Sequence, residues 1–378
     1  MNIIPTIGPS IGEVEKKFVD KAMSNWYSEP YYFCELFESE FAKYHGRKYA
    51  LMTPNCTSAI HLLLIGLDIQ EGDEVIAPEC TWIASVAPIF YQKAKVVLCD
   101  IDETTWGIDP KSVEKNITNK TKAIISVNLF GNMADMDALV EIAKKHNIPL
   151  IEDAAQSLGS TYKGVKSGKF GVGSVFSFHR TKTLTTGEGG MLLVDDDALY
   201  KRCKTFRDHG RSDDDPMYFN SEVGYKYMPN NVSAALGYGQ FTRLDELVGI
   251  KHDIFKLYQQ GLAEVPDIKL NYEPDYVYNS AWITTIVLGK SYKIQKDEFI
   301  EKLQAKGIMA RPFFYPLSSI PGINKRGYSE AEHRLKNPKA YAFTLRTINL
   351  PSPMNMTQNQ VKFICDEIKA ILLKDMYE

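Results

Sequence analysis

The stretch 123–152 reads AIISVNLFGNMADMDALVEIAKKHNIPLIE and holds two apolar runs with a helical pattern between them. The runs at 123–127 and 149–152 are rich in β-branched residues, which favour strands. Between them, the apolar residues of 135–146 recur at the spacing of one helix face. A helix that connects two strands lets those strands pair in parallel. This stretch therefore predicts a parallel strand–helix–strand unit.

The same alternation extends outward from this unit in both directions. Further strands are expected at 74–77, 95–99 and 190–194, and further helices at 57–66 and 83–92. Strands that alternate with helices are typical of the α/β class, so we expect a large, mixed but mostly parallel sheet. The pattern changes after about residue 250.

The C-terminal third has its own pattern, with a strand-like run at 282–288, a helix at 297–306 before Gly307, and a last helix opened by the capping pattern Thr357-Gln-Asn-Gln360. Glycine suits the position after a helix, and a Thr with Gln three residues later suits its start. We therefore expect two domains: a large α/β domain over 1–249 and a smaller α+β domain over 250–378.

The composition excludes several classes of protein. The chain has 378 residues, a formal net charge of −3, 44% hydrophobic and 24% charged residues. That charge gives no reason to expect a nucleic acid or an anionic membrane as partner. The six cysteines form no Cys-x-x-Cys pair, so no metal site is expected. The start Met1-Asn-Ile-Ile-Pro-Thr6 is neither basic nor long and apolar, so we expect no signal peptide, no membrane span and a cytoplasmic protein.

The first chemical candidate is Lys182, in Ser174-Val-Phe-Ser-Phe-His-Arg-Thr-Lys-Thr-Leu-Thr-Thr-Gly-Glu-Gly-Gly190. A lysine acts as a nucleophile when burial or neighbouring cations favour its neutral amine. The glycines that follow would let the backbone approach a ligand closely. Taken alone, Lys182 also fits a surface lysine in a polar loop.

Three further segments each have a functional and a structural interpretation. Asp153 follows an apolar strand, where open α/β sheets bind ligands, and could pair with the ring nitrogen of a cofactor or cap a helix. The helix start near Cys56 could bind a phosphate, or Thr57 or Ser58 could simply cap it. Trp82 follows a strand, where it could stack on a flat ring or belong to the core.

The order of these segments resembles the DegT/DnrJ/EryC1/StrS family of sugar aminotransferases that depend on pyridoxal 5'-phosphate (PLP). The motifs Ile151-Glu-Asp-Ala-Ala-Gln156 and 177–190 are specific to that family, and the likeness runs from 24–28 to 348–351. The strings Arg311-Pro-Phe-Phe-Tyr-Pro316 and Trp282-Ile-Thr-Thr285 are similar to the 4-aminotransferase branch that includes GDP-perosamine synthases.

The resemblance implies a type I fold similar to that of aspartate aminotransferase and a homodimer with active sites at the subunit interface. It implies that Lys182 is the Schiff-base lysine and moves a proton, that Asp153 pairs with the ring nitrogen, that Gln156 reaches the ring hydroxyl and that Trp82 stacks on the ring. The phosphate would be held by Cys56, Thr57 and Ser177. Substrate contacts would come from His179, Glu188, Arg311, Tyr31 and Ser28. No metal is implied.

This sequence departs from the family pattern at two positions that concern the phosphate. Cys56 replaces a glycine in the phosphate turn. Where the partner subunit usually supplies Asn-Tyr-Arg, the chain reads Lys226-Tyr-Met228, so Lys226 could serve as the cation, with Asn230 or Asn231 as alternatives. The segment 29–32 near the substrate mouth also differs, which bears on which substrate is taken.

The expected reaction is transfer of an amino group from L-glutamate to a nucleotide-linked 4-keto-6-deoxy sugar. One alternative is a smaller ketone, including a phosphorylated one, used in surface-glycan synthesis. A second is PLP-dependent dehydration of a keto sugar, but such dehydratases have histidine in place of the lysine, and His179 does not occupy the position of Lys182. A third is a PLP-binding regulator without turnover; the intact set Lys182, Asp153 and Gln156 argues against it.

Overall fold

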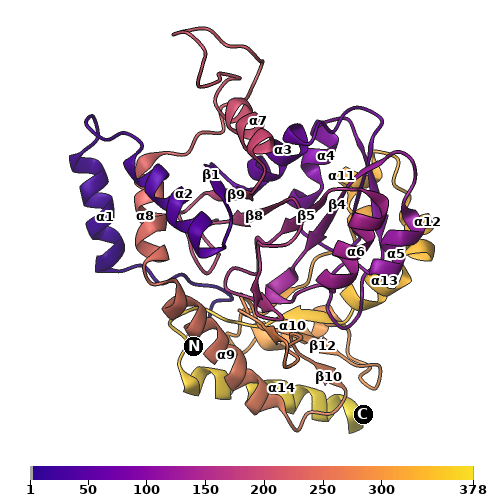
Figure 1. Ribbon diagram of the computed structural model, residues 1–378. Helices are drawn as coiled ribbons and strands as arrows, with labels where there is room; N and C mark the ends of the chain where they lie inside the picture. Colours follow the sequence, from indigo (N-terminus) through magenta and orange to yellow (C-terminus); the bar gives the residue numbers. More distant parts are fainter. Residues whose placement is uncertain (1–2, 378) are drawn as a thin grey trace.

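A seven-stranded sheet forms the centre of the protein in the computed structural model, which describes residues 3–377 (Figure 1). The strand order is β1-β9-β8-β5-β4-β2-β3. All neighbours pair in parallel except β9, which is antiparallel to both β1 and β8. This confirms the α/β class with a mixed, mostly parallel sheet. The strands are β1 (Tyr49–Thr53), β2 (Glu74–Pro78), β3 (Lys95–Cys99), β4 (Thr121–Val127), β5 (Leu150–Asp153), β8 (Gly173–Ser177) and β9 (Gly190–Val194).

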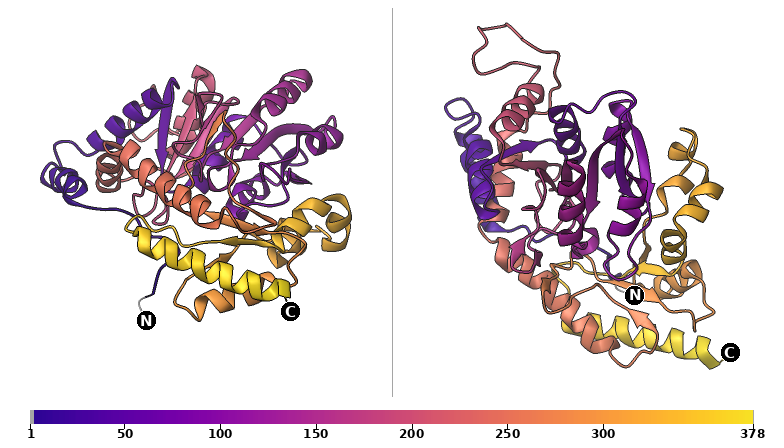
Figure 2. Two further views of the ribbon diagram at one scale, coloured as in Figure 1. Left: turned by 90° about the horizontal axis from the view of Figure 1, so that it is seen from below. Right: turned by 45° about the vertical axis from the view of Figure 1, so that its right-hand side comes forward.

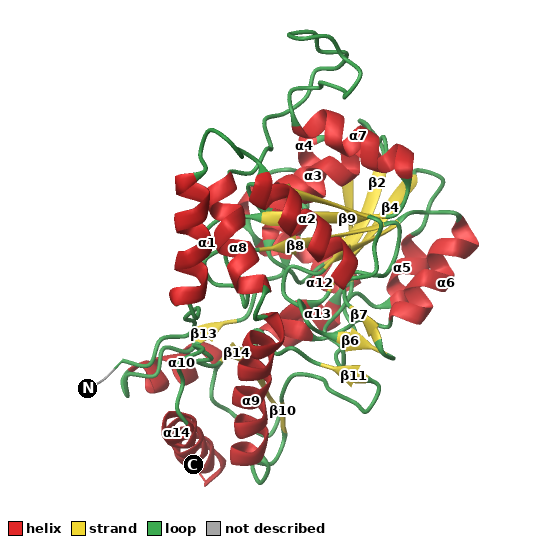
Figure 3. Ribbon diagram, turned by 60° about the vertical axis from the view of Figure 1, so that its left-hand side comes forward, coloured by secondary structure: helices red, strands yellow, loops and turns green. Residues whose placement is uncertain are grey.

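Helices cover both faces of this sheet, so its strands are buried on both sides (Figure 3). On one face lie η1 (Ile83–Ser85), α3 (Cys56–Gly66), α4 (Ala87–Tyr91) and α7 (Asp197–Arg207). On the other lie α2 (Tyr32–Tyr44), α8 (Asn231–Phe241), α5 (Pro110–Asn116) and α6 (Met136–His146), with α1 (Glu13–Ser24) packed on α8. Successive strand residues alternate between the two cores: Ile151 faces the α3 side and Leu150 the α6 side.

The elements expected from the sequence are present, with two corrections inside them. The helix expected at 83–92 is two pieces, η1 and α4, because Pro88 lies in the first turn of α4 and starts a new helix there. The strand expected at 282–288 begins only at Thr285, and Trp282 precedes it in an irregular segment. Gly307 has the positive φ of +79° expected after a helix.

The C-terminal part contains a second sheet, in the order β10-β12-β14-β13. Helix α14 lies along α9 beneath it, and together they bury a separate apolar core (Figure 2). The predicted domain boundary at 249/250 falls within α9 and stays a prediction. The elements are α9 (Leu244–Leu262), β10 (Ile268–Lys269), β12 (Thr285–Leu288), α10 (Lys296–Gln304), β13 (Arg311–Pro312), η3 (Leu317–Ser319), α11 (Pro321–Asn324), α12 (Glu330–Lys336), α13 (Pro338–Thr344), β14 (Thr347–Asn349) and α14 (Gln358–Tyr377).

Two buried carboxylates attach this C-terminal part to the large sheet. Glu79, directly after β2, accepts hydrogen bonds from Ser318 N (2.8 Å) and Oγ (2.7 Å) and from Asn337 Nδ2 (2.8 Å). Asp100, directly after β3, accepts from the backbone N–H of Ala340 (2.8 Å) at the start of α13. The segment 311–344 is therefore held against the carboxyl ends of β2 and β3.

A small third sheet also joins distant segments. Strand β6 (Thr161–Tyr162) pairs with β7 (Val165–Lys166) and with β11 (Val277–Tyr278). The 3-10 turn η2 (Leu129–Gly131) follows β4. Among residues 3–377, no helix is both long enough and apolar enough to cross a membrane.

Candidate active site

The ends of several strands meet at one edge of the large sheet, and the predicted site residues follow them. Thr53 of β1 and Ser177 of β8 are both paired with Gly190 of β9, so the three residues form a row across the sheet. Asp153 of β5 is paired with Val175, two residues before Ser177. The carboxyl ends of parallel strands lie at the same edge of a sheet, where open α/β folds bind ligands.

Lys182 lies in the loop after β8, and its ammonium faces an aromatic wall. Its Nζ is 3.5 Å from the ring centroid of Trp282, whose indole Nε1 donates to the Thr181 carbonyl oxygen (2.7 Å). Burial lowers the pKa of Lys182 to about 7; Arg311 adds to this lowering, and the Asp153 carboxylate opposes it. A large fraction of this amine is therefore neutral near pH 7.

Asp153 is a buried carboxylate that retains acceptor capacity. Its Oδ2 accepts from Ser85 Oγ (2.7 Å) and its Oδ1 from Ala155 N (3.1 Å). Burial raises the pKa of Asp153, while these hydrogen bonds and Lys182 oppose the rise. No helix begins after it, so it is not a helix cap. Gln156 accepts from Phe130 N (3.1 Å), and its Nε2 donates to no residue of the described range.

The start of α3 presents free backbone N–H groups. Its cap is Asn55, whose Oδ1 accepts from Ser58 N (2.9 Å); neither Thr57 nor Ser58 is the cap. Within residues 3–377 nothing accepts from Cys56 N or Thr57 N. Gly190 makes this arrangement possible, because a Cβ there would lie 2.6 Å from Cys56 N. Free N–H groups at a helix start form a site for an anion such as a phosphate.

Trp82 is not a core residue: 58% of its surface is exposed, and its ring centroid is 6.0 Å from that of Phe314. It precedes η1, which carries Ser85 and hence contacts Asp153. An exposed indole beside a buried carboxylate is available to stack on a flat ligand.

The other site residues of the sequence analysis fall into two groups. His179 and Glu188 flank Lys182, with His179 Nε2 3.6 Å from Glu188 Oε1, and Arg311 on β13 lies close enough to Lys182 to affect its pKa. Lys226 instead pairs with Asp208 Oδ1 (2.7 Å) at the base of a projecting loop between α7 and α8 (Figure 1).

The remaining candidates near that loop have other contacts. Asn230 caps α8 by accepting from Ser233 N (2.8 Å), and Asn231 accepts from Phe33 N (2.8 Å). Tyr31 lines a surface pocket with Cys34, Arg207 and Asp208, and exposed Ser28 donates to the Asn25 carbonyl oxygen (3.4 Å). Within residues 3–377 of one chain, no contact joins Lys226, Tyr31 or Ser28 to Lys182.

Sequence reasoning missed three residues that shape the site. Ser85 holds Asp153, and Trp282 lies against Lys182. Phe130 stacks on Trp282 with centroids 5.7 Å apart and has a positive φ of 54°, which is uncommon for a bulky residue. The indole of Trp282 stood in a quoted motif but was interpreted as part of a strand; Ser85 and Phe130 carry no local signal.

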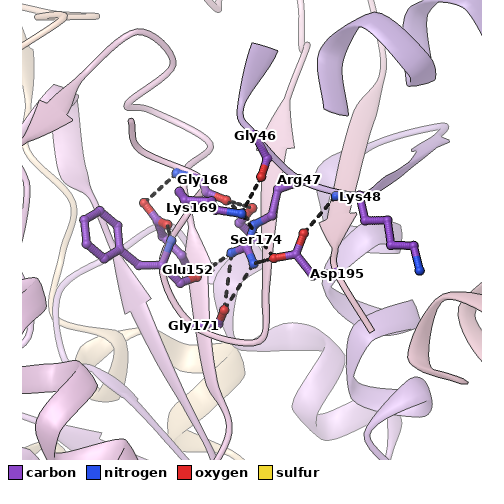
Figure 4. A network of polar contacts seen from close by, with 10 residues as sticks. Gly46, Arg47, Lys48, Glu152, Gly168, Lys169, Gly171, Ser174 and Asp195 are labelled. Carbon is purple, nitrogen blue, oxygen red and sulfur yellow. Dashed lines mark hydrogen bonds and ion pairs between the residues drawn. The ribbon is translucent and has the colours of Figure 1, made fainter. Parts of the chain in front are cut away.

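Behind Asp153, the neighbouring Glu152 belongs to a polar network on the other side of the sheet (Figure 4). Glu152 accepts from Asn128 Nδ2 (2.8 Å), Gly168 N (2.9 Å), Phe170 N (3.0 Å) and Ser167 Oγ (3.1 Å). Arg47 donates to the carbonyl oxygens of Gly168 (2.9 Å) and Phe170 (2.8 Å) and pairs with Asp195 (2.9 Å). This network fixes the turn 167–171 beneath the site.

A lysine with a lowered pKa, a buried carboxylate, an exposed indole and two free N–H groups at a helix start are the features expected of a PLP-dependent enzyme of the type I fold. The model of the DegT/DnrJ/EryC1/StrS aminotransferase family matches residues 9–369, and the chain belongs to this family. It is a PLP-dependent aminotransferase.

Known relatives cover nearly the whole chain. It is 38% identical to a GDP-perosamine synthase of Escherichia coli O157:H7, over 97% of this chain and 98% of that one, and 33% identical to a GDP-perosamine synthase of Vibrio cholerae, with the same coverage. A Streptococcus pneumoniae protein assigned as a sugar aminotransferase, solved in its pyridoxamine-phosphate form, superimposes with a TM-score of 0.92 at 28% identity, over 99% of each chain.

Proposed function

We propose that this aminotransferase moves an amino group from L-glutamate to a nucleotide-linked 4-keto-6-deoxy sugar. The observation that carries the proposal is the amine of Lys182, whose pKa is about 7 and which faces Trp282 near Asp153. The names of the two GDP-perosamine synthases to which the chain is similar support a sugar substrate.

The residues around Lys182 fit PLP. When bound, PLP supplies an electron sink that stabilises negative charge on the reacting carbon. Asp153, kept in place by Ser85, would hold a proton on the ring nitrogen and so preserve that sink. The free Nε2 of Gln156 would donate to the ring hydroxyl, and Trp82 would cover one face of the ring.

The phosphate would bind at the start of α3. The N–H groups of Cys56 and Thr57 would donate to it, and Ser177, in the same row as Gly190, would add its hydroxyl. These contacts are made by backbone donors, so the thiol of Cys56 need not take part. Cys56 is therefore compatible with a position that is glycine elsewhere in the family.

Lys182 would be both the attachment point and the base. A neutral amine can take a proton from the carbon of the donor and return it to the carbon of the ketone. His179 and Glu188, at either end of the same loop, would contact the substrate, and Arg311 would also meet substrate.

The remaining residues would act from a second copy of the chain. The projecting loop carries side chains that are almost fully exposed, Met217 (84%), Tyr218 (94%) and Val223 (93%), and such a group of apolar residues is typical of an interface. In a homodimer, Lys226 at the base of that loop, with Tyr31 and Ser28, would reach the phosphate and the substrate of the partner. The dimer would work in the cytoplasm.

The test is the visible absorption of the PLP-loaded protein. L-glutamate should remove the band of the bound cofactor, and a nucleotide-linked 4-keto-6-deoxy sugar should restore it. Restoration only by a small ketone would overturn the sugar assignment. No response to L-glutamate, with a response to another amino acid, would overturn the donor.

A further inference from the structure

Arg311 is a half-buried cation without a counter-charge. No hydrogen bond or ion pair joins its guanidinium to any residue in the range 3–377, although it is half-buried on β13, the edge strand of the C-terminal sheet. Burial lowers the pKa of Arg311, and no acidic group of the described residues opposes this. A desolvated guanidinium is unfavourable unless an anion pairs with it.

Arg346 is a matched contrast within the same part of the fold. It precedes β14, and its Nε donates to the Leu288 carbonyl oxygen (2.8 Å), while Nη2 donates to those of Gly289 and Tyr292. Its donors are used within the chain, whereas those of Arg311 are not. Arg311 therefore has the donors of a binding residue, and Arg346 those of a structural one.

A second basic group without a counter-charge, the amine of Lys251, lies near Arg311. Lys251 of α9 is only 1% exposed, and its Nζ donates to the Ser352 carbonyl oxygen. Burial lowers the pKa of Lys251 to about 7, and Arg311 adds to the lowering. Arg311 on β13 is the charged group near Lys251; Ser352, and Thr284 whose N–H donates to Ser352 Oγ, are uncharged.

A series of contacts connects Arg311 and Lys251 to the surroundings of Lys182. Thr284 follows Trp282 by two residues, and its N–H donates to Ser352, the residue that holds Lys251. Arg311 is paired with Asn349, which Thr285 Oγ1 contacts (2.8 Å). The buried Thr284 Oγ1 also has no partner among the described residues. Two polar groups without partners among the described residues, the Arg311 guanidinium and Thr284 Oγ1, thus lie close to the segment that packs against Lys182.

We propose that Arg311 binds the carboxylate of the amino donor that is attached to the reacting carbon, and that Lys251 is a positioning residue that strengthens this site with a second positive charge. The inference rests on the proposed function. A guanidinium presents two parallel donors that match a carboxylate.

The chemistry of the two substrates favours the donor over the nucleotide. The donor carboxylate is one bond from the carbon that gives up its amine, so it must lie near Lys182. In a nucleotide-linked 4-keto sugar, the diphosphate is attached across the ring from the reacting carbon. An anion site close to Lys182 therefore suits the carboxylate better than the diphosphate.

Calorimetric binding of glutarate, a dicarboxylate without an amine, to the PLP-loaded protein tests the proposal. Arg311→Met should weaken glutarate by about 30-fold or more, and Arg311→Lys by less. Arg346→Met should lower thermal stability without changing glutarate affinity of the folded protein. GDP, measured in parallel, should bind the Arg311 variants as it binds the wild type; loss of GDP with retained glutarate would overturn the proposal in favour of the diphosphate.

The pH profile tests Lys251. Below about pH 7 its ammonium is charged and favours the carboxylate, so wild-type affinity for glutarate should fall as the pH rises through about 7. Lys251→Met should weaken glutarate roughly tenfold at low pH and remove this dependence. Lys296→Met is the control, because Lys296 is also a buried lysine that donates to a backbone carbonyl, that of Thr344 (3.1 Å). A retained pH dependence in Lys251→Met would overturn the role of Lys251.

The response of the wild-type protein to amino donors distinguishes a failure of the proposed function from a failure of the carboxylate site. If wild-type protein does not respond to L-glutamate or any other amino donor, the proposed function fails. If the wild type responds and Arg311→Met, folded and loaded with PLP, responds with unchanged half-saturation, the carboxylate site alone is wrong.

Discussion

Glu152 and Asp153 are consecutive residues of β5, both carboxylates and both buried, yet they face opposite sides of the sheet. Glu152 accepts four hydrogen bonds, two of them from backbone N–H groups of the turn 167–171. Asp153 accepts one from Ser85 and one from Ala155. Burial raises the pKa of both, so neither burial nor pKa distinguishes them. The two carboxylates differ in how many hydrogen bonds they accept from the protein itself.

The contrast extends to the surroundings of each carboxylate. On the Glu152 side, all three guanidinium nitrogens of Arg47 donate to an acceptor, and these hydrogen bonds fix the turn 167–171 (Figure 4). On the Asp153 side, Gln156 Nε2, Cys56 N and the Arg311 guanidinium have no partner among the described residues. A saturated network stabilises the fold, whereas unpaired groups around one lysine indicate a site that a ligand completes.

On the Asp153 side of the sheet, replacement of Lys182 should have the largest effect on activity. Lys182→Ala should lower the rate of amino transfer by at least roughly 10²–10⁴-fold, because proton transfer loses its base. The thermal unfolding temperature should change little, since the side chain of Lys182 makes no hydrogen bond to any of the residues 3–377. Single-turnover absorbance with L-glutamate measures the first effect and calorimetry the second. Normal turnover in this variant would contradict the mechanism.

The two carboxylates themselves provide the sharpest comparison. Glu152→Gln should cost about 1–3 kcal/mol of stability, because an amide would face the N–H groups of Gly168 or Phe170 and leave a donor unsatisfied. Its activity per folded molecule should persist. Asp153→Asn should show the reverse: near-normal unfolding by urea but greatly slowed transfer. Equal effects of both changes on both measurements would remove the distinction.

The lowered pKa of Lys182 predicts how PLP is taken up. The neutral amine is the reactive form, so the rate constant for uptake by the apoprotein should rise with pH, with a midpoint of about 7, and then level off. Below the midpoint the rate should fall about tenfold per pH unit, as for a single ionisation. Stopped-flow absorbance measures it; a midpoint near that of an ordinary lysine would show that the amine is not desolvated.

The smallest expected effect concerns two helix caps. Asn55→Ala at α3 and Asp196→Ala at α7 should each cost about 1 kcal/mol of stability, since each cap accepts one N–H. Only Asn55→Ala should also weaken PLP, because of these two helices it is α3 that begins at the sheet edge that carries Asp153 and Ser177. Equal PLP affinity in the two variants would argue that the phosphate binds elsewhere.

Much of the fold could be predicted because the relevant signals are local. Apolar runs gave five of the seven strands of the large sheet, but not β1 or β8. Helical spacing gave α3 and α6 nearly to the residue. The break between η1 and α4 was missed, although Pro88 marks it. Trp282 was placed in a strand because its neighbours are β-branched, but its indole instead packs across Phe130 and Lys182.

The site was predictable where a residue sits at a strand end and unpredictable where it acts by contact. Lys182, Asp153 and Cys56 follow strands whose order along the sheet brings them together, and the pKa of Lys182 responds to both of the others. Ser85 and Trp282 gain their importance from neighbours more than 60 residues away in sequence. Lys226 shows the converse, since one chain alone leaves it paired with Asp208.

The attachment of segment 311–344 through Glu79 and Asp100 has a practical consequence for anyone who divides or recombines this protein. A fragment ending near residue 249 would leave both carboxylates without their donors and would expose the apolar surface that Phe313, Leu317 and Phe343 share with the large sheet. Chimeras that exchange substrate preference between relatives should therefore take their C-terminal segment together with the loops after β2 and β3, as one cassette.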